Sequence, residues 1–394
     1  MLKKQNECLK MNFEFYLPVK LIAGEGSALR VAEFAKKSDA ARVLIITGKH
    51  VSASAGFQDF IRSLKDAKLP FEVYRDTLPE PPAAFVDALA DYLRKEPFDL
   101  VAAVGGGSVM DTAKAACMLK TNPGSVKEYL FGGNRTIQSQ PLPLVCIPTT
   151  AGSGSEVTAS SVIFDPEKKI KLSVTHPSLI PKAAILDPLL QLDMPPSVTA
   201  GTGMDALTHA IEAFTSRDAS PVSDMYAKTA IRMIGRALPQ VMRNPGDANS
   251  RMEMSLASTL AAAAFVNGGL GAVHGISQSM GGVAHTPHGV SNAILLPEVM
   301  SVNRKGNTEK FAQIAALLGQ DTAGMDEETA SLTAVDAVVR MNRTVGIPHG
   351  TSEIGVTKAM FPQIIDGTMG YRLLWMNPVS ITPDVVEHIL EATY

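Results

Sequence analysis

Four side chains in the second half of the chain have the types and spacing to bind one metal ion. Asp205 and His209 are four positions apart, so a helix places them on one face, one turn from each other. We expect His274 and His288 to come from a second helix and the turn after it. One carboxylate and three imidazoles suit iron(II) or zinc, and an open coordination position would let the ion polarise a substrate oxygen. Glu212 either orients one of these imidazoles or is an exposed helix residue.

Two glycine-rich loops have the composition of phosphate-binding loops. Residues 105–108, Gly-Gly-Gly-Ser, lie between a predicted buried strand and a predicted helix, where backbone amides can bind an anion. A tight turn is the alternative, because the run differs from the Gly-x-Gly-x-x-Gly fingerprint. A second loop, residues 148–156, also follows a buried strand and is rich in threonine, serine and glycine. Two such loops after two strands favour a bound dinucleotide.

Strand-like and helix-like segments alternate in the first half of the chain, which indicates a parallel sheet covered by helices, with ligands at the carboxyl ends of the strands. The predicted strands are residues 43–47, 71–75, 100–104 and 144–148, and the predicted helices are 56–67, 82–95 and 108–120. Residues 160–176 predict a β-hairpin around a charged turn.

The pattern changes at Pro195 and Pro196, which break any regular element. Beyond them the apolar spacing is helical, with a fully buried helix expected at 256–265 and amphipathic helices at 325–345 and 383–392. We therefore expect an α/β domain over residues 1–195 and an all-helical domain over residues 196–394.

Composition excludes several classes of protein. A net charge of −3 on 394 residues gives no reason to expect nucleic-acid binding, which usually needs a basic face. Three cysteines cannot build a disulfide framework, and Cys117 and Cys146 are expected to be buried thiols in a reducing cytosol. No signal peptide or membrane span is recognisable. We expect a cytoplasmic protein that binds neither nucleic acid nor membrane.

The order and spacing of these motifs resemble the iron-dependent (group III) alcohol dehydrogenases over nearly the whole chain. The matching segments are residues 105–114, 148–158, 202–212 and 274–297. The resemblance implies a dehydroquinate synthase-like fold, with an N-terminal α/β dinucleotide-binding domain, a C-terminal all-α metal-binding domain, a cleft between them and a homodimer. It implies that the metal, Fe(2+) or Zn(2+), is held by Asp205, His209, His274 and His288.

The resemblance also assigns the cofactor loops. It implies that the pyrophosphate is bound by Gly106, Gly107 and Ser108, and that the nicotinamide half lies near Thr149, Thr150 and Lys171. Without the resemblance, Lys171 would be interpreted as a solvated charge on the hairpin.

The activity implied is hydride transfer between NAD(P)(H) and a small primary alcohol or aldehyde, with the metal as Lewis acid. Phe265, expected on the same helix as His274, either lines the substrate pocket or packs in the helix core. The alternative is a metal-dependent lyase on the same scaffold. A lyase with an acidic substrate would need basic side chains around the cleft, and residues 199–215 and 265–290 contain none.

This chain departs from the family at a position where many members carry a histidine near the substrate. Here the residue is Gln278, whose amide does not titrate near neutral pH. A proton relay would then use water, the ribose hydroxyls or His285. We hypothesise that Gln278 instead selects a polar or anionic group of the substrate.

A second departure follows the strand at 43–47. NAD-preferring relatives commonly place an aspartate after the threonine, whereas this chain has Gly48 and Lys49. No carboxylate would repel a 2′-phosphate there, and Lys49 and Ser52 could bind one. We expect NADP(H) to be accepted or preferred; the alternative is a loop that leaves NAD(H) binding adequate.

Overall fold

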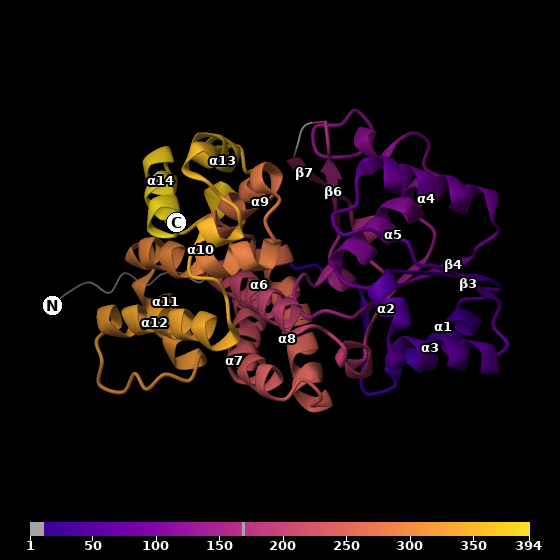
Figure 1. The fold of residues 1–394 in the computed structure, drawn as a ribbon, viewed down its shortest axis with the longest axis horizontal. Helices are drawn as coiled ribbons and strands as arrows, with labels where there is room; N and C mark the ends of the chain where they lie inside the picture. The colour runs from indigo at the N-terminus through magenta and orange to yellow at the C-terminus, as the bar shows by residue number, and fades with distance from the viewer. Residues whose placement is uncertain (1–11, 168–169) are drawn as a thin grey trace.

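The N-terminal half is built on a sheet of six parallel strands. They are β1 (Lys20–Ala23), β2 (Val43–Thr47), β3 (Phe71–Tyr74), β4 (Leu100–Gly105), β5 (Leu144–Pro148) and β8 (Ala183–Leu186), in the order β1-β8-β5-β4-β2-β3. The structure, a computed structural model, describes residues 12–167 and 170–394. Figure 1 shows this half beside a second half made of helices. The arrangement confirms the predicted fold class.

Helices cover both faces of the sheet, which explains why β2, β4 and β5 are buried along their whole length and almost entirely apolar. These helices are α1 (Val31–Lys37), α2 (Lys49–Ala53), α3 (Ala55–Asp66), α4 (Ala83–Lys95) and α5 (Gly107–Thr121). Successive strand residues point to opposite faces. Val43 and Ile45 share a core with α3, whereas Leu44 and Ile46 pack with α4 and α5.

The predicted strands and helices of this half are confirmed to within two residues at each end. Four elements were not expected, namely β1, β8, α1 and α2. They contain four to seven residues, too few for a hydrophobic period to be recognised in the sequence. Cys117 and Cys146 are buried free thiols, as predicted.

The predicted hairpin is confirmed as the antiparallel pair β6 (Ser160–Asp165) and β7 (Ile170–Thr175). It forms a sheet of its own, and β7 packs against helix α9 (Ala272–Ala284) of the other half. Figure 1 shows the hairpin facing α9 across the gap between the two ribbons.

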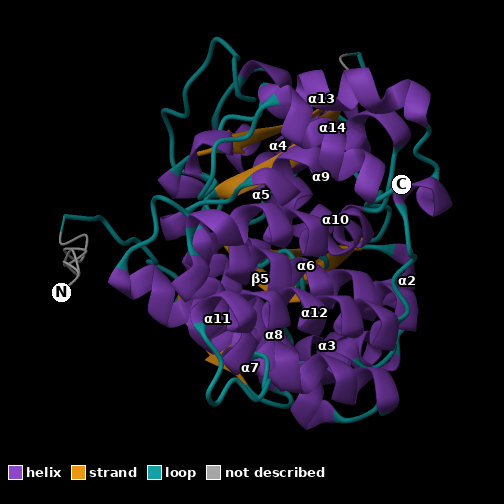
Figure 2. Cartoon of the chain, turned by 90° about the vertical axis from the view of Figure 1, so that its left-hand side faces the viewer, coloured by secondary structure: helices purple, strands orange, loops and turns teal. Residues whose placement is uncertain are grey.

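The C-terminal half is helical throughout. Its further helices are α6 (Pro196–Thr215), α7 (Pro221–Arg243), α8 (Ala248–Gly268), α10 (His288–Asn303), α11 (Thr308–Leu317), α12 (Glu327–Val345), α13 (Phe361–Met369) and α14 (Pro383–Ala392). In Figure 2, seen from this side, the helices lie in front and the strands are visible only behind them. Helix α6 begins next to the predicted boundary, but the division into domains at residue 195 stays a prediction.

Helices α8 and α9 follow each other with a bend of 102° at a short break. Gly269 in this break has φ +91°, a conformation that favours glycine. Most of the run at 256–265 is buried as expected, although Leu256, Leu260 and Phe265 are partly exposed. Among the described helices none is by itself long and apolar enough to span a membrane; the bent pair α8–α9 meets that test only when the two are taken together.

The segment before β1 connects the two halves a second time. Phe15 stacks on Tyr226 of α7 with 5.3 Å between ring centroids, and the backbone amide of Tyr16 donates to Asn267 of α8. Leu17 then packs in a small apolar cluster that contains residues of both halves. The chain therefore passes between the halves near residue 19 as well as near residue 195.

Candidate active site

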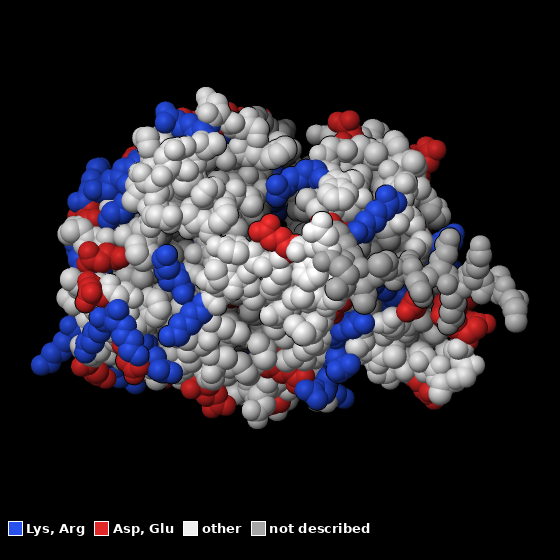
Figure 3. All heavy atoms as spheres, turned by 180° about the vertical axis from the view of Figure 1, so that it is seen from behind, with Lys and Arg blue, Asp and Glu red and all other residues white. Residues whose placement is uncertain are grey.

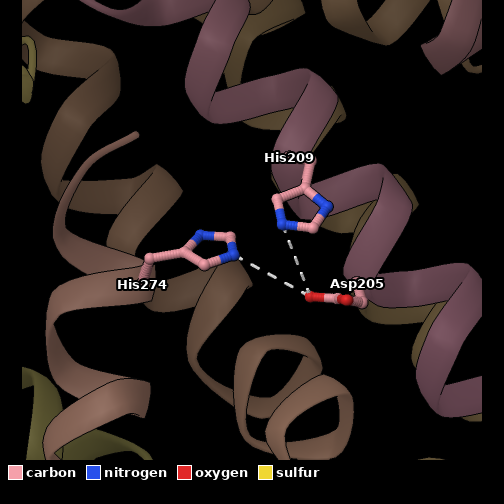
Figure 4. A group of neighbouring side chains, drawn as sticks. All are labelled: Asp205, His209 and His274. Carbon is pink, nitrogen blue, oxygen red and sulfur yellow. Dashed lines mark ion pairs between the residues drawn. The ribbon is translucent and has the colours of Figure 1, made fainter. Parts of the chain in front are cut away.

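Three of the predicted metal ligands lie close together and point toward one another. Asp205 and His209 lie on one face of α6, and His274 comes from the first turn of α9 (Figure 4). One possible ligand atom from each lies within 4.8 Å of the others, and all three residues are buried. The Oδ1 atom of Asp205 is 4.0 Å from Nε2 of His209 and 3.8 Å from Nε2 of His274.

The fourth candidate, His288, reaches the same point. Its Nε2 atom lies 3.8 Å from Oδ1 of Asp205. His288 is the first residue of α10 and not part of a turn, so the expectation for its local structure was wrong. Pro287 precedes it as the N-cap, and a proline at that point directs the chain into the new helix.

Asn292 lies one turn after His288 and donates a hydrogen bond of 2.7 Å to Oδ1 of Asp205. Its Nδ2 atom is also 3.2 Å from Nε2 of His274 and 3.3 Å from Nε2 of His288. An amide nitrogen has two hydrogens, so it cannot serve three acceptors at once. The four side chains thus offer more lone pairs than the described residues can satisfy, and a divalent cation fits such a donor set.

The electrostatics favour neutral imidazoles at His209 and His288 beside an ionised Asp205 carboxylate. Burial alone would raise the pKa of Asp205, but the three histidines and the hydrogen bond from Asn292 lower it. Burial lowers the pKa of His209 to about 4 and that of His288 to about 3, and the charge of Lys171 adds to the effect on His288. Neutral imidazoles are the form that binds metals.

Glu212 is buried and holds His274 in place. Its carboxylate lies 2.6 Å from Nδ1 of His274 and accepts a 2.7 Å hydrogen bond from the backbone amide of Val273. Burial alone would lower the pKa of His274, but the charge of Glu212 raises it. With the Nδ1 proton held by Glu212, the Nε2 lone pair of His274 faces the other ligand candidates. The alternative, an exposed helix residue, is wrong.

Phe265 borders this cluster, but not in the predicted way. It lies near the end of α8, before the bend, so the expectation that it shares a helix with His274 was wrong. Its ring stacks on His209 with 4.5 Å between centroids, and His209 stacks on His274 at 4.6 Å. The bend lets α8 and α9 approach the imidazole of His209 from two sides.

Gln278 and His285 lie further along α9. Gln278 is partly exposed, one turn after His274 on the same face, and its amide has no hydrogen bond to another described residue. His285 caps the helix in the left-handed conformation with φ 52°. It is exposed, and its ring packs edge-on against Phe164 of β6, 5.8 Å away. The structure therefore places His285 at the rim and not within the cluster.

The two predicted phosphate loops meet at the carboxyl ends of β4 and β5. The backbone amide of Thr149 donates to the carbonyl oxygen of Gly105 at 3.0 Å. A Cβ atom on Gly106 would lie 3.2 Å from Oγ1 of Thr150, and one on Gly107 would lie 2.9 Å from Oγ of Ser153. A side chain at Gly107 would therefore displace the Ser153 side chain of the second loop, and the backbone amides at the N-terminus of α5 lie where an anion could bind.

The loop after β3 also contacts the carboxyl end of β4. Glu80, in the segment after β3, donates its backbone amide to Oγ of Ser108 at 3.3 Å. Its carboxylate forms an ion pair with Lys171 of β7. The side chain of Lys171 is only 12% exposed, so its interpretation as a solvated charge is wrong.

The comparisons with known proteins agree with this geometry. Residues 18–188 match the family model described as iron-containing alcohol dehydrogenase, and residues 199–394 match the C-terminal model of the Fe-containing alcohol dehydrogenase family. The long-chain-alcohol dehydrogenase 1 of Geobacillus thermodenitrificans is 38% identical over 375 residues, which cover 94% of both chains.

The chain belongs to the iron-containing alcohol dehydrogenase family. The NAD-dependent methanol dehydrogenase of Bacillus methanolicus is 36% identical over 87% of this chain and 89% of its own length. The solved structure of a 1,3-propanediol oxidoreductase superposes with a TM-score of 0.93 at 33% identity, over 97% of this chain and 100% of that one. This alcohol dehydrogenase is thus an NAD(P)-dependent oxidoreductase of alcohols and aldehydes, and no comparison supports the lyase alternative.

Several polar residues that support the site of this alcohol dehydrogenase were missed from the sequence. Asn292 follows His288 by four positions, a spacing that could have identified it. Lys114, on α5, donates to the side chains and backbone of Ser155 and Thr158 in the second loop. Glu80 carries no such signal, because its partners lie far from it in the chain.

Proposed function

We propose that this chain is an iron(II)-dependent alcohol dehydrogenase whose metal is held by Asp205, His209, His274 and His288. The observation that carries the proposal is the meeting of one carboxylate oxygen and three Nε2 atoms at separations of 3.8 to 4.0 Å. Such distances are too long for hydrogen bonds and suit atoms that share one ion. When bound, the metal supplies a Lewis acid for the oxygen of the alcohol or aldehyde. Zinc would accept the same donor set.

The protein side chains around the metal would orient its ligands. Glu212 fixes the tautomer of His274, and Phe265 fixes the ring plane of His209. Phe265 would also limit the size of the substrate pocket. The partly exposed amide of Gln278, with its hydrogen-bonding groups free, would contact a polar group of the substrate, and His285 at the rim would pass a proton to solvent.

The nicotinamide cofactor supplies or accepts the hydride. We infer that its pyrophosphate binds Gly106, Gly107 and Ser108 at the N-terminus of α5. Thr149, Thr150 and Lys171 would then lie along its nicotinamide half.

Metal removal tests the proposed function. Protein stripped with a chelator should lose nearly all aldehyde reduction with NAD(P)H, measured as oxidation of the reduced nicotinamide. One equivalent of iron(II) or zinc per chain should restore it, whereas magnesium, which prefers oxygen ligands, should not. Full activity in stripped protein that contains no metal would overturn the proposal.

A carboxylate next to Lys49 affects the predicted cofactor preference. Asp76, after β3, lies 3.7 Å from Nζ of Lys49 next to Gly48, and both side chains are largely exposed. We propose that Lys49 binds a 2′-phosphate and that Asp76 weakens this binding. Asp76→Asn should therefore raise kcat/KM for NADPH about threefold relative to NADH, and Lys49→Ala should lower it by a similar factor. A strong NADH preference that neither substitution changes would contradict this assignment.

Gln278 is tested by the same assay. Gln278→Ala should lower kcat/KM for aldehydes with a second hydroxyl more than for plain aldehydes of equal length, by about tenfold for one lost hydrogen bond. If Gln278→Ala and Gln278→His both leave rate and preference unchanged, the residue has no role in selection.

We further propose a cytoplasmic homodimer. The family resemblance implies the dimer, and the buried thiols of Cys117 and Cys146 suit a reducing compartment. Light scattering coupled to size-exclusion chromatography measures the mass directly, and a mass near 42 kDa would exclude the dimer.

A further inference from the structure

Lys171 brings a positive charge to the side of the cleft that faces the metal candidates. Its Nζ atom would lie 3.3 Å from a Cβ atom on Gly281 of α9, so the absence of a side chain there makes room for the ammonium group. The side chain of Lys171 thus extends from the hairpin to α9, the helix that carries His274.

The segments that carry the metal candidates supply no other cation, although Arg372 lies nearby, 5.8 Å from the ring of Phe131, whose backbone amide donates to Ser173 of β7. Residues 199–215 and 265–290, which carry all four metal candidates, contain no lysine or arginine. Figure 3 shows that the surface around the notch between the two halves is mostly uncharged, with only a few basic and acidic side chains beside it. Lys171 is therefore a main source of positive charge on this side of α9.

The carboxylate of Glu80 pairs with the Lys171 ammonium group, and hydrogen bonds hold the backbone around Glu80 in position. Its φ is 49°, an uncommon value for a residue with a side chain. The next residue, Pro81, accepts a hydrogen bond from the backbone amide of Phe164, the cross-strand partner of Lys171. The backbone amide of Glu80 also donates a hydrogen bond to Oγ of Ser108. These contacts place the Glu80 carboxylate on Lys171 rather than in solvent.

We propose that Glu80 is a specificity-determining residue that masks Lys171, so that the enzyme prefers uncharged aldehydes and alcohols over anionic ones. The inference rests on the proposed function, because it assumes that the substrate binds between α9 and the hairpin. An anionic substrate gains affinity from a free ammonium group nearby, whereas an ammonium already paired with a carboxylate offers little net attraction. Conversion of Glu80 to an uncharged residue should expose the charge of Lys171.

The test compares two aldehydes of equal chain length, neutral butanal and anionic succinate semialdehyde. Wild-type enzyme should favour butanal. Glu80→Gln keeps the shape and one hydrogen-bond acceptor but removes the charge, and it should raise the kcat/KM ratio of semialdehyde to butanal about tenfold. Because both assays use the same cofactor, any effect on cofactor binding cancels in the ratio. The double variant Glu80→Gln with Lys171→Ala should lose the gain, and added salt should reduce it.

Binding of a non-reacting anion tests the effect of Glu80 independently of catalysis. Butyrate should bind metal-free Glu80→Gln more tightly than metal-free wild-type protein, measured by calorimetry. Glu253→Gln, which removes a carboxylate paired with Arg236 on the outer surface, is the matched control and should change neither readout. An unchanged ratio and unchanged butyrate binding in Glu80→Gln would overturn the inference. A wild-type enzyme that reduces neither aldehyde after metal loading would instead overturn the proposed function.

Discussion

Asp205→Ala should remove metal binding and lower kcat by at least about a thousandfold. That factor corresponds to a loss of several kcal/mol of transition-state stabilisation, which is the contribution expected of a metal Lewis acid. Asp205 is the one carboxylate among the proposed ligands, and its Oδ1 atom lies within 4.0 Å of all three Nε2 atoms. Removal of this atom leaves three neutral imidazoles without the negative charge that attracts a divalent ion.

Metal content and rate should be measured on the same preparation. Elemental analysis should find less than one tenth of an equivalent of iron per chain in Asp205→Ala, with a circular dichroism spectrum like that of wild-type protein. Glu253→Gln should retain both metal and rate, because its ion-pair partner among the described residues is Arg236, whose side chain is largely exposed. If Asp205→Ala keeps its iron and its kcat, the metal is bound elsewhere.

Lys114→Met should destabilise the protein by about 3 to 5 kcal/mol, the cost of removing one partner from a buried charge cluster. Lys114 is 1% exposed, and its ammonium donates to Ser155, Thr158 and the carbonyl oxygen of Ser160. Burial lowers its pKa and raises the pKa values of Asp111 and Glu156 nearby. Lys114 is the cation that acts on these two carboxyl groups within the described part of the chain, so without it they should take up protons.

The measurement combines stability with cofactor binding. The melting temperature of Lys114→Met should fall by several degrees, and its KM for NAD(P)H should rise, because Lys114 anchors the loop that carries Thr149 and Thr150. Lys65→Met removes an exposed lysine from α3 and should change neither value. A melting temperature equal to that of wild-type protein would show that the cluster does not hold the loop.

The sequence predicted the elements that have a period and missed contacts that depend on the tertiary fold. Asp205 and His209 could be placed together because helical spacing is a local property. Strands β2, β4 and β5 could be recognised because burial on both faces makes them continuously apolar. Strand β8, with four residues, takes its place between β1 and β5 only after the chain returns from the hairpin.

Several contacts of the site could not be predicted from the sequence. Phe265 and His274 are nine positions apart in a helical apolar pattern, which led to one predicted helix although Gly268, Gly269 and Gly271 between them are typical of a break. Lys171 resembled a solvated hairpin charge because its partner, Glu80, precedes it by 91 positions. Asp76 likewise reaches Lys49 only because β2 and β3 are adjacent in the sheet.

The segment before β1 limits how the cleft can open. Phe15 and Tyr16 are fixed to α7 and α8, while β1, a few residues later, belongs to the sheet. Together with the passage near residue 195, this gives the two halves a pair of tethers. Two connections leave the halves less freedom of relative motion than one would, so any opening between them should be a rotation about the line that joins the two crossings.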